Sequence, residues 1–204
     1  MKTVLIVDDH AILRMGLKSL IENCCDLKCV GDASDGDSAV RLAESLRPHI
    51  VIMDLVMPGM DGVKTTAEIL KVSPSSRILI LTSFGTADGI AYALEAGACG
   101  AILKSADHAD ILAAIRAVGD GKRSISPEIR RILAENPTVP RLSPRQEEIL
   151  TALAKGLTNH DIALQLNLSN DVVKEYVANI LHKLGAANRT EAVAIALNKN
   201  LNKI

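Results

Sequence analysis

The chain has 204 residues, enough for one large domain or two small ones, and 48% of them are hydrophobic. Its formal net charge of −1 fits a globular protein and names no partner. Because no apolar run approaches the ~18 residues of a membrane span and the N-terminus lacks a signal-peptide pattern, we expect a cytoplasmic protein.

Charge is distributed unevenly along the chain. Residues 1–125 contain 13 Lys or Arg against 16 Asp or Glu, whereas residues 140–204 contain 8 against 6. An acidic first part and a mildly basic last part fit two domains with different partners. The four cysteines match no common zinc spacing and are expected to be small, buried side chains.

Short apolar runs recur along residues 1–121, at 4–7, 29–30, 50–53, 78–81 and 101–103. Each gap between them is wide enough for one helix. The first gap has apolar residues at helical spacing, namely Ile12, Leu13, Leu17, Leu20 and Ile21. This alternation predicts an α/β domain with a five-stranded, doubly wound parallel sheet covered on both faces. The domain is expected to end near Gly121.

The rest of the chain is predicted to be helical. Residues 122–140 form a linker in this interpretation, with one short helix that Ser126 and Pro127 begin. Helix-start signals follow at Ser143, Thr158, Ser169 and Thr190. Residues 141–204 are therefore predicted to form a small all-α domain of four helices.

Most of the predicted strands end in a polar residue. Asp8 and Asp9 follow the first strand, Asp54 the third, Thr82 the fourth and Lys104 the fifth. Open parallel sheets bind ligands beyond the carboxyl ends of their strands, so these groups should converge. Three carboxylates at one edge repel one another unless a cation lies among them, and Mg²⁺ suits so sparse a set of oxygen ligands.

A metal ion alone would not require Thr82 and Lys104, but a phosphoryl group would. Lys104 offers a cation to phosphoryl oxygens, Thr82 offers a hydroxyl donor, and one carboxylate can act as the nucleophile. Asp54 is the preferred acceptor because it stands alone at the end of its strand. Any one of these acids could instead solvate a loop or cap a helix, but that does not explain polar groups at four strand ends.

The motifs VDDH…R.GL, DLVMPGMDG, LTS and EAGACGAILK, taken in this order, resemble the receiver domains of two-component response regulators over residues 1–121. The resemblance implies a flavodoxin-like fold and phosphorylation of Asp54 by a sensor histidine kinase. It also implies that Asp8, Asp9 and Asp54, with the carbonyl of Val56, hold Mg²⁺.

One position departs from the receiver pattern. Receivers usually have Tyr or Phe three residues before the lysine, where a rotating ring transmits the state of the site, and this chain has Ala101 there. The coupling between site and surface is therefore expected to be altered. We hypothesise that Phe84 or Tyr92 takes over part of this role.

The third predicted helix of the last domain, residues 169–184, has a polar face opposite its apolar stripe. That face contains Asp171, Lys174, Glu175, Ala178, Asn179 and His182. Small, amide and cationic side chains on an exposed helix suit the major groove of DNA. On the charge pattern alone, an ordinary solvated helix face is the better interpretation.

Residues 141–200 resemble the LuxR-type helix-turn-helix, and with the receiver they resemble the NarL/FixJ family of response regulators. The resemblance implies a recognition helix at 169–184, with Lys174 and Asn179 toward DNA and Thr158 and Asn159 near phosphate. Val172 stands where the family often has Thr, and Glu175 adds negative charge. Binding is thus expected to depend on dimerisation.

The leading hypothesis is a transcription regulator, not an enzyme, whose phosphorylation at Asp54 promotes homodimerisation and DNA binding. One alternative is an aspartyl-phosphate phosphohydrolase, but such enzymes usually have a second Asp where Val56 stands. The other alternative is an interaction module whose last domain binds a protein, which the weak basic charge keeps open.

Overall fold

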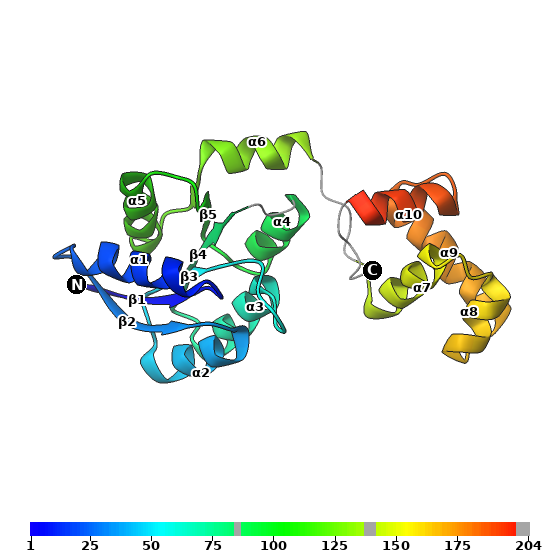
Figure 1. The fold of residues 1–204 in the computed structure, drawn as a ribbon, viewed down its shortest axis with the longest axis horizontal. Helices are drawn as coiled ribbons and strands as arrows, with labels where there is room; N and C mark the ends of the chain where they lie inside the picture. The colour runs from blue at the N-terminus through cyan, green and yellow to red at the C-terminus, as the bar shows by residue number, and fades with distance from the viewer. Residues whose placement is uncertain (84–86, 137–141, 199–204) are drawn as a thin grey trace. The chain divides into compact units, whose positions relative to one another are not determined.

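The computed structural model describes residues 1–83, 87–136 and 142–198. The chain divides into two compact units, Met1–Pro137 and Thr138–Ile204 (Figure 1). Each unit has its own hydrophobic core and is described by itself.

The first unit is built around a parallel β-sheet. Its strands are β1 (Lys2–Val7), β2 (Leu27–Ala33), β3 (Ile50–Met53), β4 (Arg77–Thr82), β5 (Gly100–Leu103) and β6 (Ser124–Ile125). They lie in the order β2-β1-β3-β4-β5-β6, and every neighbouring pair is parallel. The predicted α/β class is confirmed. The sheet has six strands rather than five, because two linker residues pair with the edge of β5.

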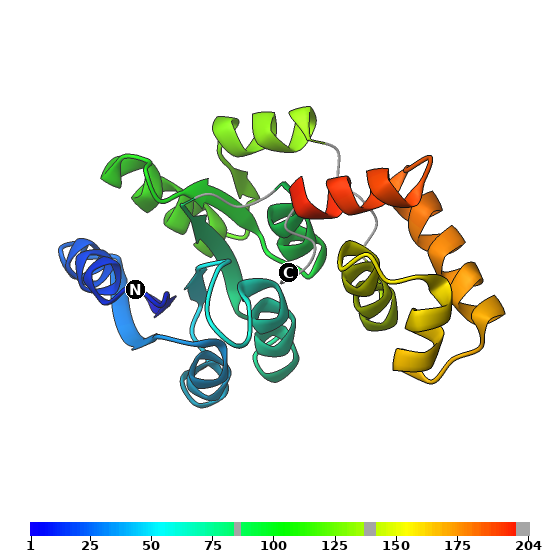
Figure 2. The same cartoon turned by 45° about the vertical axis from the view of Figure 1, so that its right-hand side comes forward.

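In the part of this unit that the structure describes, the helices are α1 (Ala11–Glu22), α2 (Gly36–Leu46), α3 (Gly62–Val72), α4 (Ala87–Glu95), α5 (His108–Gly119) and α6 (Pro127–Glu135). Helices α1 and α5 cover one face of the sheet, and α2, α3 and α4 cover the other (Figures 1 and 2).

Strand β1 shows why the predicted strands are continuously apolar. Val4 and Ile6 pack into the cluster that contains α1 and α5, whereas Leu5 and Val7 pack into the cluster on the other face. Because successive side chains point to opposite faces, a strand covered on both sides has no position for a polar residue until its end.

Helix α6 packs onto the first unit rather than standing in a linker. Ile129 is fully buried in the same cluster as Ala101 of β5, and α6 contacts both α4 and β5. Residues 122–140 were predicted to be a linker, but β6 and α6 extend the first unit beyond residue 121. A two-residue strand is too short to show a period in the sequence.

Ile12 shares the apolar spacing of α1, but its side chain is 86% exposed. One smaller expectation, that the cysteines are buried, was wrong. Cys25 is exposed, whereas Cys24, Cys29 and Cys99 are half-buried; all four thiols are free.

The described residues of the second unit form four helices, as predicted: α7 (Pro144–Ala154), α8 (Asn159–Leu166), α9 (Asn170–Leu184) and α10 (Arg189–Asn198). Ser143 and Gln146 form the expected capping box, and Thr158 and Ser169 cap α8 and α9. Gly185 ends α9 in the left-handed conformation, with φ +65°. None of the helices within the described ranges is long and apolar enough to cross a membrane.

The buried side chain of Ile129 allows a test of whether α6 contributes to the core of the first unit. Ile129→Ala should lower the free energy of unfolding of the first unit by about 2–5 kcal/mol, because it removes a fully buried side chain. Arg131→Ala, at a 74% exposed side chain of the same helix, should change it by less than ~0.5 kcal/mol. Urea unfolding of both variants measures the difference; equal effects would show that α6 does not contribute to this core.

Candidate functional site

The strand order brings the ends of β1 and β3 together at the centre of the sheet. Asp8 follows β1 and Asp54 follows β3, and the backbone N–H of Asp54 donates to the carbonyl of Val7 at 2.9 Å. In the order 2-1-3-4-5 the winding direction reverses between β1 and β3, which is where such sheets bind ligands. Both carboxylates therefore lie at the expected edge.

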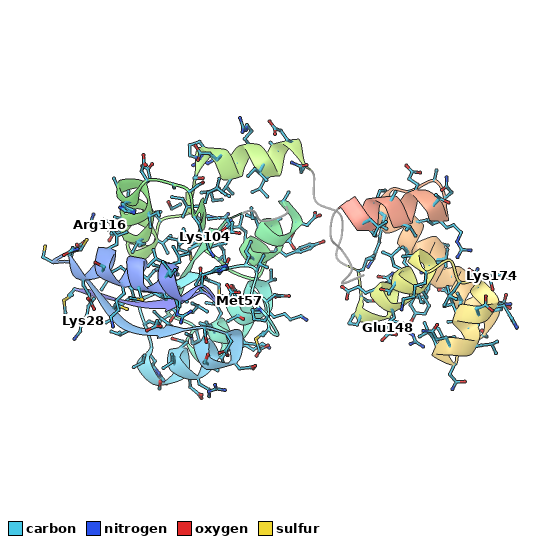
Figure 3. All side chains as sticks on the ribbon, in the orientation of Figure 1. Lys28, Met57, Lys104, Arg116, Glu148 and Lys174 are labelled. Atoms are coloured by element: carbon cyan, nitrogen blue, oxygen red, sulfur yellow. The ribbon has the colours of Figure 1, made fainter. Side chains whose placement is uncertain are left out.

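Lys104 joins these two carboxylates. Its Nζ lies 2.6 Å from Oδ2 of Asp8 and 2.8 Å from Oδ2 of Asp54. The side chains are buried, with exposures of 10% for Lys104, 2% for Asp8 and 4% for Asp54. Figure 3 shows Lys104 among the side chains of the first unit. An ammonium group that follows β5 thus offsets the charge of acids that follow β1 and β3.

Burial and pairing act in opposite directions on these groups. Loss of solvent raises the pKa of Asp54 above its ordinary value, although the hydrogen bond from Lys104 partly counteracts this. For Lys104, loss of solvent by itself would lower the pKa, but hydrogen bonds to Asp54 and Asp8 raise it overall. The ammonium is therefore held in its charged form.

Four side chains could hold a metal ion at this edge. Asp8, Asp9, His10 and Asp54 each offer a ligand atom within 4.8 Å of the others. Asp9 is only partly covered, and His10, exposed over 68% of its side chain, places Nδ1 2.6 Å from Oδ1 of Asp9. Three carboxylates beside one ammonium leave an excess of negative charge, which suits a divalent cation with oxygen ligands.

Two residues of the site were missed by sequence reasoning. His10 was left without a role, although it follows the Asp pair directly. Arg14 on α1 donates from Nη1 to the carbonyl of Asp8 at 2.8 Å and from Nε to Asp32 at 3.0 Å. Helical periodicity identifies apolar faces and gave no signal for this cation.

The loop after Asp54 folds back onto that residue. The N–H of Val56 lies 3.4 Å from Oδ1 of Asp54, and the N–H of Gly62 donates to the carbonyl of Leu55 at 3.0 Å. A Cβ at position 62 would overlap the carbonyl oxygen of Asp54 and lie 2.8 Å from Cα of Leu55. Glycine at 62 is therefore required for this close approach. The side chain of Val56 is 67% exposed.

Thr82 ends β4 beside these groups. Its carbonyl accepts from the N–H of Lys104 at 2.8 Å, and the residue is only 1% exposed. Its Oγ1 is buried without a hydrogen-bond partner among the described residues. A buried, unpaired hydroxyl costs about 1–3 kcal/mol, so this oxygen suits a ligand that accepts its hydrogen bond. The residues present thus fit both a divalent cation and a phosphoryl group.

The position that departs from the receiver pattern is tightly packed. Ala101 is fully buried in β5, in the cluster that includes Ile129 of α6. Tyr92 is half-buried on α4. Phe84, the other residue of our hypothesis, lies outside the described residues.

The residues predicted to meet DNA lie on α8 and α9. Lys174 and Asn179 are exposed on α9, and Lys174 lies at the surface of the second unit (Figure 3). Nζ of Lys174 is 3.0 Å from Asp171. Thr158 is exposed and Asn159 half-buried at the start of α8. The N–H of Asp161 donates to the hydroxyl of Thr158 at 3.2 Å and the N–H of Thr158 donates to the carboxylate of Asp161 at 3.0 Å, which together form a capping box.

In a comparison with known protein families, each of the two units matches one family. Residues 4–116 match the response regulator receiver domain, and residues 140–196 match the bacterial regulatory proteins of the luxR family. The chain belongs to the NarL/FixJ family of response regulators.

This response regulator is similar along nearly its whole length to characterised relatives. It is 38% identical to the transcriptional regulatory protein LiaR of Bacillus subtilis, over 97% of this chain and 98% of LiaR. It is 37% identical to the response regulator VraR of Staphylococcus aureus, over 97% of each chain. Among solved structures, RcsB of Salmonella enterica bound to promoter DNA with the phosphomimetic BeF₃⁻ has a TM-score of 0.67 and 28% identity, over 95% of this chain and 97% of RcsB.

Two glycines of this response regulator, one at the loop and one inside α1, test the close approach at position 62. Gly62→Ala should lower the free energy of unfolding by about 1–3 kcal/mol, because the added methyl group meets backbone atoms that cannot move independently. Gly16→Ala, inside α1 with no atom within 4 Å of the new Cβ, should instead raise it by about 0.5–1 kcal/mol. Denaturant unfolding measures the free energy of unfolding of both variants. A Gly62→Ala protein as stable as the parent would contradict the close approach.

Proposed function

We propose that this response regulator controls transcription through phosphorylation of Asp54 by a sensor histidine kinase, which shifts the receiver conformation and promotes homodimerisation and DNA binding. The observation that carries the proposal is the Lys104 ammonium between Asp8 and Asp54, in a chain that continues into a luxR-type unit.

In this proposal Asp54 is the nucleophile. One of its carboxylate oxygens forms a bond to phosphorus while the bond from phosphorus to the kinase histidine breaks, and the imidazole leaves with the electron pair of that bond. Asp8, Asp9 and Asp54, with the carbonyl of Val56, would hold Mg²⁺. When bound, the ion supplies positive charge that offsets the charge on the transferred group.

Lys104 and Thr82 are proposed to hold the phosphoryl group after transfer. The Lys104 ammonium is already 2.8 Å from Oδ2 of Asp54, within reach of an oxygen on the new group. The buried hydroxyl of Thr82, without a partner among the described residues, would gain an acceptor. These new bonds favour one receiver conformation over another, so phosphorylation biases an existing equilibrium.

For the second unit we propose that α9 enters the major groove. Lys174 and Asn179 would contact DNA from α9, and Thr158 and Asn159 would approach phosphate at the start of α8. The likeness to RcsB, solved on promoter DNA, supports this role. A twofold dimer would occupy half-sites about 10 base pairs apart, or a multiple of that spacing.

Phosphorylation of Asp54 is testable without the kinase. With acetyl phosphate and Mg²⁺, mass spectrometry of the whole protein should show one phosphoryl adduct, formed as acetate leaves. Removal of Mg²⁺ by a chelator should abolish the adduct, because the phosphoryl charge is then offset by Lys104 alone.

Asp54→Asn should form no adduct under the same conditions, and Asp37→Asn, an exposed acid on α2, should react like the parent. An adduct that persists in Asp54→Asn would place the acceptor elsewhere and refute this part of the proposal.

Lys174 gives a test of the DNA interface. Lys174→Ala should weaken binding to all duplex sequences alike and reduce the slope of log affinity against log salt concentration by about 1, because one phosphate contact is lost. Fluorescence anisotropy over a range of salt concentrations measures both.

Lys155→Ala serves as the matched control, since Lys155 is an exposed lysine at the end of α7 outside the proposed interface. If parent and both variants bind random duplex with no dependence on salt, the alternative role, in which the second unit binds a protein, becomes the better one.

A further inference from the structure

Within the proposed DNA-binding function, we infer that Glu175 is a specificity-determining residue that accepts a hydrogen bond from a cytosine amino group in the major groove. The inference combines the position of Glu175 on α9, the absence of a partner for its carboxylate among the described residues, and the chemistry of base edges.

Glu175 lies on the line of α9 that is farthest from the core. The buried stripe of α9 is formed by Val173, Ile180 and Leu184. Glu175 follows Val173 by two residues, which places it about 200° around the helix axis, opposite that stripe. Lys174 lies about 100° from the stripe, on one flank of the exposed face. If α9 lies in the groove with its exposed face inward, Glu175 points at the base edges and Lys174 at one backbone.

No described residue neutralises the carboxylate of Glu175. In the part of the chain that the structure describes, it has no hydrogen bond or ion pair. The neighbouring cation, Lys174, is instead paired with Asp171 at 3.0 Å. Glu175 also lines a hollow of about 220 Å³ with Val172, Tyr176 and Asn179, which leaves space beside the carboxylate for a base edge.

The hydrogen-bonding groups of the base edges make a carboxylate in the major groove selective for one base. DNA carries one negative charge per about 1.7 Å of helix axis, so an acid brought into the groove is repelled unless a donor meets it. Cytosine presents only its N4 amino donor in the major groove. Adenine places the N7 acceptor beside its amino group, and guanine presents two acceptors, so both oppose a carboxylate. Glu175 therefore favours cytosine and also weakens binding to unrelated sequences.

Glu175→Gln should change the sequence that is selected. The amide is neutral and nearly the same shape, and glutamine pairs with the N6 and N7 atoms of adenine. Selection from a randomised duplex library, with the full chain treated with acetyl phosphate, should enrich cytosine at one position of each half-site for the parent. The variant should lose this preference or change it to adenine, and its affinity for random duplex should rise.

Glu147→Gln is the matched control, because it makes the same change at an exposed acid of α7 outside the proposed interface. It should leave both the affinity and the cytosine preference of the parent unchanged. A duplex with N4-methylcytosine at the selected position should bind the parent about tenfold more weakly, since the methyl group removes the amino donor from the groove. Thermal unfolding checks that both variants are folded.

The possible outcomes separate this inference from the function on which it rests. If the parent selects a sequence and Glu175→Gln selects the same one, or if the parent prefers adenine at that position, the role of Glu175 is wrong while DNA binding stands. If the parent shows no salt-dependent duplex binding at all, both are overturned.

Discussion

The ammonium group of Lys104 holds two buried carboxylates at one edge of the sheet, and the candidate site depends on this interaction. A buried charge is costly unless it is paired, and Asp8 and Asp54 come from different strands. The parallel sheet places β1 beside β3 and lets Lys104, which follows β5, reach both carboxylates. With Asp9 nearby the acids still outnumber the ammonium, so the fold leaves an excess of negative charge that a cation can offset.

The sequence predicted the parts of this site that follow from strand ends. Asp8, Asp54, Thr82 and Lys104 each come at or directly after the end of an apolar strand, and parallel strands end at the same edge. Helix starts at Ser143, Thr158 and Ser169 were also predictable, because a side-chain cap is a local interaction. The roles of these residues in phosphoryl transfer and DNA binding remain predictions.

The features that the sequence did not reveal depend on contacts between distant residues. Strand β6 has two residues and exists because Ser124 and Ile125 meet the edge of β5. Ile129 gives α6 one fully buried position, too few to show which unit the helix joins. Ile12 has the spacing of a core residue, but α1 turns it outward. Arg14 belongs to the first motif, but its bond to the Asp8 carbonyl is a contact between elements that the motif did not reveal.

The loop that follows Asp54 has a consequence for protein engineering. Because a side chain at position 62 would occupy the space of the Asp54 carbonyl, the start of α3 and the end of β3 form one steric unit. A chimaera that exchanges this segment with another receiver must take both ends together and keep glycine at the junction. A designed sensor that replaces the loop alone and loses glycine at this junction would bring a side chain against the backbone of Asp54.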